Sequence, residues 1–196
     1  QIQRNHTATH LLHQAVKEVL GEHVQQAGSL VAPESLRFDL THYEQISNNQ
    51  LEEIEARINA VILGNRVVDT EIKNYEAARD EGAVSLFGEK YGDAVRVVNV
   101  SGFSKELCGG THVNRTGDIG CIKIISESAL ATGIRRLIAV TGDEVSKLFT
   151  TQYHIIREIR DELKCTEEEI LTRLQLLVAD RKNLERENKK LKESTI

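Results

Sequence analysis

Two pairs of potential metal ligands, each spaced by four residues, constrain the fold of this chain more than any other feature. His6 and His10 lie in the segment NHTATH, and Cys108 and His112 lie in ELCGGTH. On a helix, residues i and i+4 lie on one face about one turn apart, so two such imidazoles can bind one ion. A fold that used all four side chains would have to bring both ends of a long intervening segment to one point.

The donor set of one thiolate and three imidazoles favours zinc, which takes nitrogen and sulfur ligands tetrahedrally. Considered one at a time, His6 and His10 are more simply explained as partly buried helix residues, and Cys108 is more simply explained as a small apolar residue. Together with His112, and with glycines beside the cysteine that permit a tight turn, the four favour a metal site. A structural zinc takes four protein ligands and a catalytic zinc leaves a position for water or substrate, so both kinds of site stay open.

Composition excludes several classes of protein. The chain has 196 residues, of which 40% are hydrophobic and 28% charged, as in an ordinary soluble globular protein. No segment approaches the length of a membrane span, and the first residues lack the apolar core of a signal peptide. Three cysteines without regular spacing argue against a disulfide framework and predict a cytoplasmic location. A net charge of −5 argues against general nucleic-acid binding, but a local basic patch could still hold a structured RNA.

Hydrophobic periodicity and turn residues predict an α+β fold, with a mixed or antiparallel sheet packed against helices. The first predicted helix begins at the cap Asn5 and ends before Gly21, and the second begins at Ser47 and ends at Gly64. A short helix is predicted over 76–82. The predicted strands are 28–31, 35–40, 67–75, 95–100, 120–126 and 133–141.

The composition changes after Gly142, which predicts one domain over 1–142 and a helical extension over 143–196. Residues 143–163 read as one helix, and Thr166 begins a second one with a capping box. Leucines and an isoleucine in that second helix follow the spacing of a coiled coil or helical hairpin. The extension could form a homodimer or pack back on its own chain. The missing initiator Met and the abrupt end at Ile196 suggest a piece of a longer protein, although processing would leave a similar start.

Five segments occur in the same order as in the editing domain of alanyl-tRNA synthetase. The segments NHTATH, HVQQAGSLV, ELCGGTH, TGDIGCIKIISES and GIRRLIAVTG resemble that family over about residues 4–142. The helices after them resemble the start of the C-terminal region of the same enzyme. Free-standing alanyl-tRNA editing proteins and, more distantly, threonyl-tRNA synthetase contain the same type of domain. The last two segments and the helical extension favour the alanyl enzyme.

The resemblance implies an aminoacyl-tRNA deacylase that removes serine, with glycine as a second candidate, from wrongly charged tRNA(Ala) and spares alanine. It implies a Zn²⁺ held by His6, His10, Cys108 and His112. The further positions that match the family's pocket are Thr9, Gln26, Ser29 and Thr111, and Cys108 is counted with them as catalytic. Arg135 matches a position of tRNA contact. The implied partners are the acceptor end of tRNA(Ala) and the remainder of a synthetase chain.

The need to separate serine from alanine explains why an editing site would recognise the seryl hydroxyl. A pocket for alanine discriminates poorly against serine, whereas a second site with polar groups that need the seryl hydroxyl leaves them unpaired when alanine enters. We assign that role to Thr9, and the role of oxyanion donor to the N–H groups near Gly109 and Gly110. Arg135 and Arg136 alternate on a strand, so one could meet a phosphate or base edge while the other pairs with a carboxylate such as Glu127, or both could simply be solvated strand charges.

Three alternatives remain from the sequence. The first is a free-standing editing protein of the same fold. The second is a zinc-stapled RNA-binding module without catalysis, in which all four ligands close the site. The third, a dimerisation module built on the last helix, accounts only for the C-terminal quarter of the chain.

Overall fold

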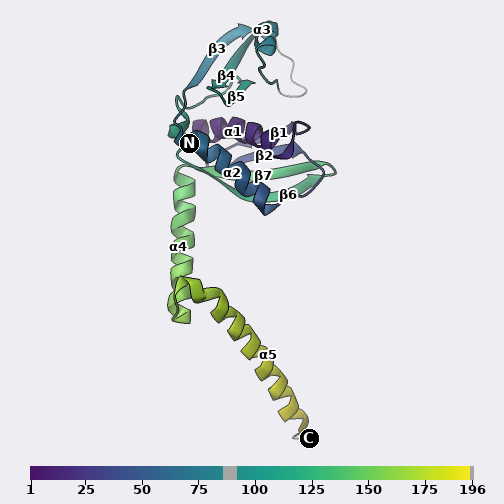
Figure 1. The fold of residues 1–196 in the computed structure, drawn as a ribbon, viewed down its shortest axis with the longest axis vertical. Helices are drawn as coiled ribbons and strands as arrows, with labels where there is room; N and C mark the ends of the chain where they lie inside the picture. The colour runs from purple at the N-terminus through teal and green to yellow at the C-terminus, as the bar shows by residue number, and fades with distance from the viewer. Residues whose placement is uncertain (86–91, 195–196) are drawn as a thin grey trace. The chain divides into compact units, whose positions relative to one another are not determined.

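The computed structural model describes residues 1–85 and 92–194. They fall into two compact units, Gln1–Ser146 and Lys147–Ile196. The first unit contains two antiparallel sheets together with the helices α1 (Ile2–Leu20), α2 (Asn48–Leu63) and α3 (Tyr75–Asp80) (Figure 1). The predicted α+β class is therefore confirmed. No helix within the described ranges combines the length and the apolar character that crossing a membrane requires.

The larger sheet has four strands in the order β1-β2-β7-β6, and all neighbours are antiparallel. Its strands are β1 (Gln26–Val31), β2 (Leu36–Thr41), β6 (Ile122–Ala131) and β7 (Ile134–Thr141). Helices α1 and α2 pack together against this sheet (Figure 1). The core between them consists of fully buried side chains such as Leu11, Phe38, Ile58 and Leu137, and burying each one stabilises the fold by about 1.5–3 kcal/mol.

The smaller sheet has three strands in the order β3-β4-β5, namely β3 (Val68–Asn74), β4 (Ala94–Val100) and β5 (Ser104–Leu107). With α3 it buries a small core of its own around Ala78, Val97 and Leu107. Helix α1 contacts β5 as well as the larger sheet and lies between the two sheets (Figure 1). The sequence did not predict β5, because four residues are too few to show an alternating pattern.

Helix ends follow the capping residues except at the first helix. Ser47 and Gln50 form a capping box at the start of α2, and Gly21 ends α1 with a φ of 115°, which favours glycine. The prediction that Asn5 caps α1 is wrong, since the helix begins at Ile2 and Asn5 is completely buried inside it. The Asn5 amide donates to Ala32 O at 2.6 Å, and its oxygen accepts from Thr141 Oγ1 at 2.5 Å.

The helical extension consists of α4 (Asp143–Leu163), the 3₁₀ turn η2 (Glu167–Glu169) and α5 (Ile170–Ser194). Helix α4 has the predicted bounds, and the predicted capping box of Thr166 with Glu169 is present. Many large apolar side chains of α4 and α5 are exposed, among them Phe149, Tyr153, Leu171, Leu177, Leu184 and Leu191. The helical character is confirmed, and the choice between coiled coil, hairpin and homodimer stays a prediction.

Candidate metal centre

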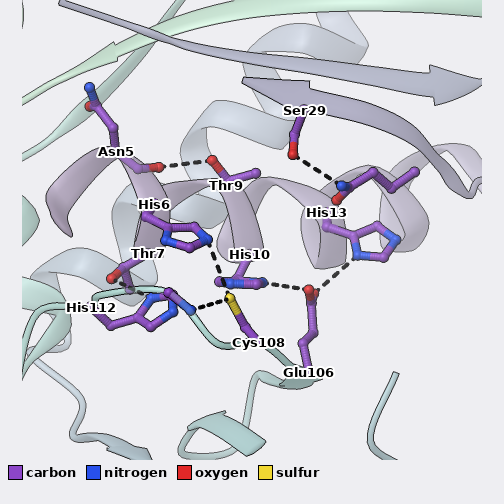
Figure 2. A network of polar contacts seen from close by, with 12 residues as sticks. Asn5, His6, Thr7, Thr9, His10, His13, Ser29, Glu106, Cys108 and His112 are labelled. Carbon is purple, nitrogen blue, oxygen red and sulfur yellow. Dashed lines mark hydrogen bonds and ion pairs between the residues drawn. The ribbon is translucent and has the colours of Figure 1, made fainter. Parts of the chain in front are cut away.

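The structure brings the four predicted ligands to one point. His6 and His10 lie one turn apart on α1, and Cys108 and His112 lie in the segment that follows β5 (Figure 2). Their ligand atoms all lie within 4.8 Å of one another. The Cys108 sulfur is 3.3 Å from His6 Nε2. One thiolate and three imidazoles at such separations are a donor set that can hold one zinc ion.

Two of the histidines direct a ring nitrogen at this point because their other nitrogen is already paired. His10 Nδ1 lies 2.5 Å from the Glu106 carboxylate, and His112 Nδ1 lies 3.2 Å from Thr7 Oγ1. The Thr7 hydroxyl donates its own proton to Gln3 O at 2.9 Å. The Thr7 oxygen therefore accepts a hydrogen bond from the N–H at His112 Nδ1. Within the described ranges, Nε2 of His10 and of His112 is buried without a hydrogen-bond partner. Such nitrogens fit metal ligation.

Charges around the cluster favour a cation at its centre. Burial would raise the pKa of the Cys108 thiol, but the neighbouring imidazoles of His10, His112 and His6 lower it to about 3. Burial would likewise raise the pKa of Glu106, but the charge of His10 and hydrogen bonds from His10 and His13 lower it to about 2. Burial opposes the charged form of His10, yet the Glu106 carboxylate and the Cys108 thiolate raise its pKa to about 10. The buried Glu106 carboxylate and the half-buried Cys108 thiolate attract positive charge, either a proton or a metal ion.

The loop that carries Cys108 can approach α1 because residue 110 is glycine. A Cβ at Gly110 would lie 2.0 Å from His6 Cε1, whereas a Cβ at Gly109 would have no atom within 4 Å. The Gly110 N–H is directed at the Cys108 sulfur, at 3.5 Å. The Arg96 guanidinium donates to the carbonyl oxygens of Cys108 and Gly110. Sequence reasoning missed Arg96, because a lone arginine on a strand gives no sign of which carbonyls it will meet.

Glu106 is the second residue that sequence reasoning missed. Its two oxygens accept from His10 Nδ1 at 2.5 Å and from His13 Nδ1 at 3.1 Å, and all three side chains are buried (Figure 2). A carboxylate that orients a metal-binding histidine is a recurring feature of zinc sites. The available signal was its position two residues before Cys108, because alternate residues of a strand share a face.

Comparison with known proteins agrees with this geometry. A family model described as "Threonyl and Alanyl tRNA synthetase second additional domain" matches residues 95–138. The chain is 50% identical over 184 residues to the alanine–tRNA ligase of Clostridioides difficile, which covers 94% of this chain and 21% of the relative. It is 52% identical over 191 residues to that of Geobacillus kaustophilus, with coverages of 97% and 22%. The resemblance to the editing region of alanyl-tRNA synthetase is confirmed. The chain spans about a fifth of the length of the curated relatives that it matches.

The other positions matched to the alanyl-tRNA synthetase pocket lie beside the cluster or at a distance from it in the sheet. Thr9 lies on the flank of α1 that faces β1, and its hydroxyl donates to Asn5 O at 2.8 Å (Figure 2). Gln26 Nε2 donates to Ser29 Oγ at 3.1 Å on β1. Thr111 is exposed and lies next to His112 in the chain.

Arg135, the position matched to tRNA contact in the synthetase family, lies on β7 and forms an ion pair with Glu127 at 2.5 Å. Its neighbour Arg136 makes a bidentate pair with Asp39 at 2.7 and 2.9 Å. Both arginines thus have a carboxylate partner, where the sequence suggested that one could stay free. A tRNA phosphate at Arg135 would have to share the guanidinium with Glu127 or replace Glu127 as its partner.

Proposed function

We propose that residues 1–142 form an editing domain that hydrolyses seryl-tRNA(Ala), and with it glycyl-tRNA(Ala), and spares alanyl-tRNA(Ala). The convergence of His6, His10, Cys108 and His112 carries this proposal, and the similarity to alanine–tRNA ligases supports it. The ligand that the site would bind is the acceptor end of tRNA(Ala) with its esterified amino acid. Residues 143–196 would then begin the C-terminal helical region of a synthetase chain.

The donor set fits a zinc ion, held by the thiolate of Cys108 and the imidazoles of His6, His10 and His112. When bound, such an ion can polarise an ester carbonyl or make a water molecule more acidic. Glu106 and Thr7 fix the orientation of His10 and His112. The groups that the reaction needs are therefore positioned before a substrate arrives, which lowers the cost of binding in the reactive geometry.

The reaction is an ester hydrolysis. A water oxygen bonds to the ester carbonyl carbon, the bond from that carbon to the ribose oxygen breaks, and the ribose oxygen takes up a proton. Free serine and uncharged tRNA are the products. Because the Gly110 N–H is directed at the Cys108 sulfur, the role of oxyanion donor in this loop falls to the Gly109 N–H.

Selectivity for serine would come from the flank of α1 that faces β1. The Thr9 hydroxyl donates its proton to Asn5 O, so its oxygen keeps a lone pair that can accept from a seryl hydroxyl. Alanine would leave that acceptor unpaired in a site where Thr9 is only 4% exposed, and an unpaired buried acceptor costs about 1–3 kcal/mol. Gln26 and Ser29 lie on β1, which this flank faces.

A deacylation assay tests the proposal. Seryl-, glycyl- and alanyl-tRNA(Ala) are incubated with the parent protein and with Cys108→Ala, and the release of the amino acid is measured. The parent should hydrolyse the first two faster than the third, and the variant should lose this activity. Cys121→Ala is the matched control, since that cysteine lies outside the cluster. A Cys108→Ala variant with the parent's rate would refute the site.

One observation favours a second candidate, a zinc-stapled RNA-binding module without catalysis. The cluster offers four protein ligand atoms, one from each residue. A zinc ion with four protein ligands is typical of structural sites. In that case the protein would bind tRNA(Ala) without hydrolysing any of the three esters. A free-standing editing protein would share the activity proposed above and would differ only in having no synthetase attached.

A further inference from the structure

A second feature of α1 extends the metal cluster along the helix. His6, His10, His13 and Lys17 follow one another at spacings of four, three and four residues, so they lie on one face. His13 and Lys17 take no part in the ligand set. Lys17 lies seven residues beyond His10, or roughly 10 Å along the helix axis.

A cavity of about 190 Å³ lies at the end of this stripe. Its lining consists of His13, Lys17, Val24, Gln25, Gln26, Val84 and Ser85. Three elements build it: α1, the start of β1, and the segment at Val84, which exchanges main-chain hydrogen bonds with β5. Because His13 also contacts Glu106, the cavity adjoins the polar network of the metal centre.

The charge in this cavity is positive and weakly compensated. The Lys17 side chain is 18% exposed, and its carboxylate partner is Glu22 at 3.8 Å, whose own side chain is 88% exposed. Among the residues that the structure describes, none that line this cavity carries a carboxylate. A lysine ammonium held in such a place is suited to a phosphate, which it binds as a point charge. The volume is below the roughly 300–1,000 Å³ of pockets for drug-sized ligands, so one small polar group fits better.

A second polar cavity, of about 370 Å³, opens beside His112, and its charges are balanced. Its lining includes Arg4 and Asp118. Arg4 is also paired with Asp143 at 3.2 Å. A phosphate would therefore meet no net positive charge there, which favours the cavity at Lys17.

We propose that the cavity at His13 and Lys17 binds the ribose-phosphate of the terminal nucleotide of tRNA, with the Lys17 ammonium pairing with its 5′-phosphate. This inference rests on the proposed editing function and adds the binding site for the nucleotide. The ester would lie at the metal centre, and the ribose would pass His13 and Gln26. The distance from His10 to Lys17 is one that a single nucleotide, together with the length of the lysine side chain, can span.

Two small esters test the role of the phosphate. One is 3′-O-seryl-adenosine, and the other is the same ester with a 5′-phosphate. The parent protein should hydrolyse the phosphorylated ester with a kcat/KM about tenfold higher, as expected for one charged hydrogen bond. Lys17→Gln should remove this preference through KM, and Lys17→Arg should keep it. Lys123 lies on β6 and pairs with Glu55 of α2, so Lys123→Gln should leave the preference for the phosphorylated ester unchanged.

The outcomes separate the two proposals. If the parent hydrolyses seryl-tRNA(Ala) but shows no preference between the two esters, the phosphate site is refuted and the editing function stands. If Lys17→Gln slows both esters equally, Lys17 acts only through the fold, and the inference is also refuted. If the parent hydrolyses none of these substrates, the editing function itself is wrong, and the inference falls with it.

A competition experiment needs no variant and so does not depend on how Lys17→Gln folds. Adenosine 5′-monophosphate should inhibit hydrolysis of seryl-tRNA(Ala) by the parent about tenfold more strongly than adenosine does. Added salt should reduce this difference, because the contact is an ion pair. Equal inhibition by the two compounds would refute the phosphate site.

Discussion

At the scale of single residues, Glu106 sets the geometry of the centre although it is not one of the four ligands. It is 4% exposed, and its oxygens are divided between His10 and His13. A buried carboxylate is stable only when it is paired and hydrogen-bonded, and here two imidazoles of the same helix provide both. The pairing directs Nδ1 of His10 at Glu106 and so leaves Nε2 available to a metal ion.

Replacing Glu106 by Gln should weaken zinc binding by about 10–100-fold. The amide oxygen can still accept from one histidine, but the amide N–H₂ cannot accept from the other, and the negative charge is lost. Competition with a chromophoric chelator measures the affinity. Glu81→Gln is the control, because that carboxylate is exposed and pairs with lysines away from the cluster. Equal affinity of the parent and Glu106→Gln would show that Glu106 does not support the ligands.

The two glycines of the CGGTH loop give a matched pair of substitutions. Gly110→Ala places a methyl group 2.0 Å from the present position of His6 Cε1, so the imidazole or the loop must move. We expect zinc affinity to fall by about tenfold or more, since a ligand is displaced. Gly109→Ala meets no atom within 4 Å and should bind zinc like the parent. Identical zinc affinities for the two alanine variants would mean that the close approach of the loop to α1 is not required.

Thr9→Val removes the hydroxyl and nearly keeps the shape of the side chain. If Thr9 reads the seryl hydroxyl, kcat/KM for seryl-tRNA(Ala) should fall by about tenfold, since one hydrogen bond in a buried site is lost, while alanyl-tRNA(Ala) is hydrolysed as before. Thr9→Ser keeps a hydroxyl and should retain the selectivity. An unchanged ratio of the two rates in Thr9→Val would remove Thr9 from the recognition role.

The cluster of four potential metal ligands could be predicted from the sequence, but the residues that support it could not. Two i,i+4 pairs of His and Cys residues are a local pattern, and the chemistry of zinc gives a reason to join them. The roles of Glu106, Thr7 and Arg96 depend on which groups the fold brings near them. Hydrogen bonds between residues about a hundred positions apart, such as Thr7 with His112, leave no periodic trace in the chain.

At the scale of elements, α1 connects the parts of the first unit, and Asn5 joins that helix to two distant segments. Its amide binds the carbonyl of Ala32 between β1 and β2, and the hydroxyl of Thr141 at the end of β7. The sequence suggested a helix cap because asparagine favours that position. The structure instead uses the same hydrogen-bonding capacity across tertiary contacts, which a local rule does not anticipate.

Asn5→Ala should destabilise the fold by about 1–3 kcal/mol, because it leaves the buried Ala32 carbonyl and Thr141 hydroxyl without the amide. Denaturant unfolding of the parent and the variant measures the change. Asn49→Ala, at an exposed asparagine of α2, is the control and should stay within about 0.5 kcal/mol of the parent. Similar stabilities of the two variants would show that the contacts of Asn5 are replaceable by neighbouring groups.

Helices with clear ends were predicted better than short strands. Ser47 and Gly64 mark the ends of α2, and α4 has the bounds predicted from its composition and periodicity. Strand β5 was missed because its stability comes from pairing with β4 over four residues and from packing on α1. Glu106 and Leu107, the first two residues of the ELCGGTH segment, therefore belong to β5.

At the scale of the whole first unit, the two sheets differ in how much they depend on the metal centre. The larger sheet and α1 share a continuous core that includes Leu11, Leu12 and Phe38, and this core does not need the ligands. The smaller sheet has a core of a few side chains on one face, contributes Val98 and Val100 to the main core, and meets α1 through β5 and the CGGTH loop. An ion shared by His6, His10 and the loop would therefore add a further attachment of the smaller sheet to α1.

Removing the metal should then loosen one sheet and spare the other. With zinc bound and then chelated, we expect amide hydrogen exchange to accelerate in β3, β4 and β5, while β2 and β7 keep most of their protection, because local opening follows local contact. Hydrolysis of seryl-tRNA(Ala) should be lost in the same sample and return on adding zinc. If chelation instead unfolds both sheets together, the ion acts as a structural staple, and the non-catalytic module becomes the better account of this centre.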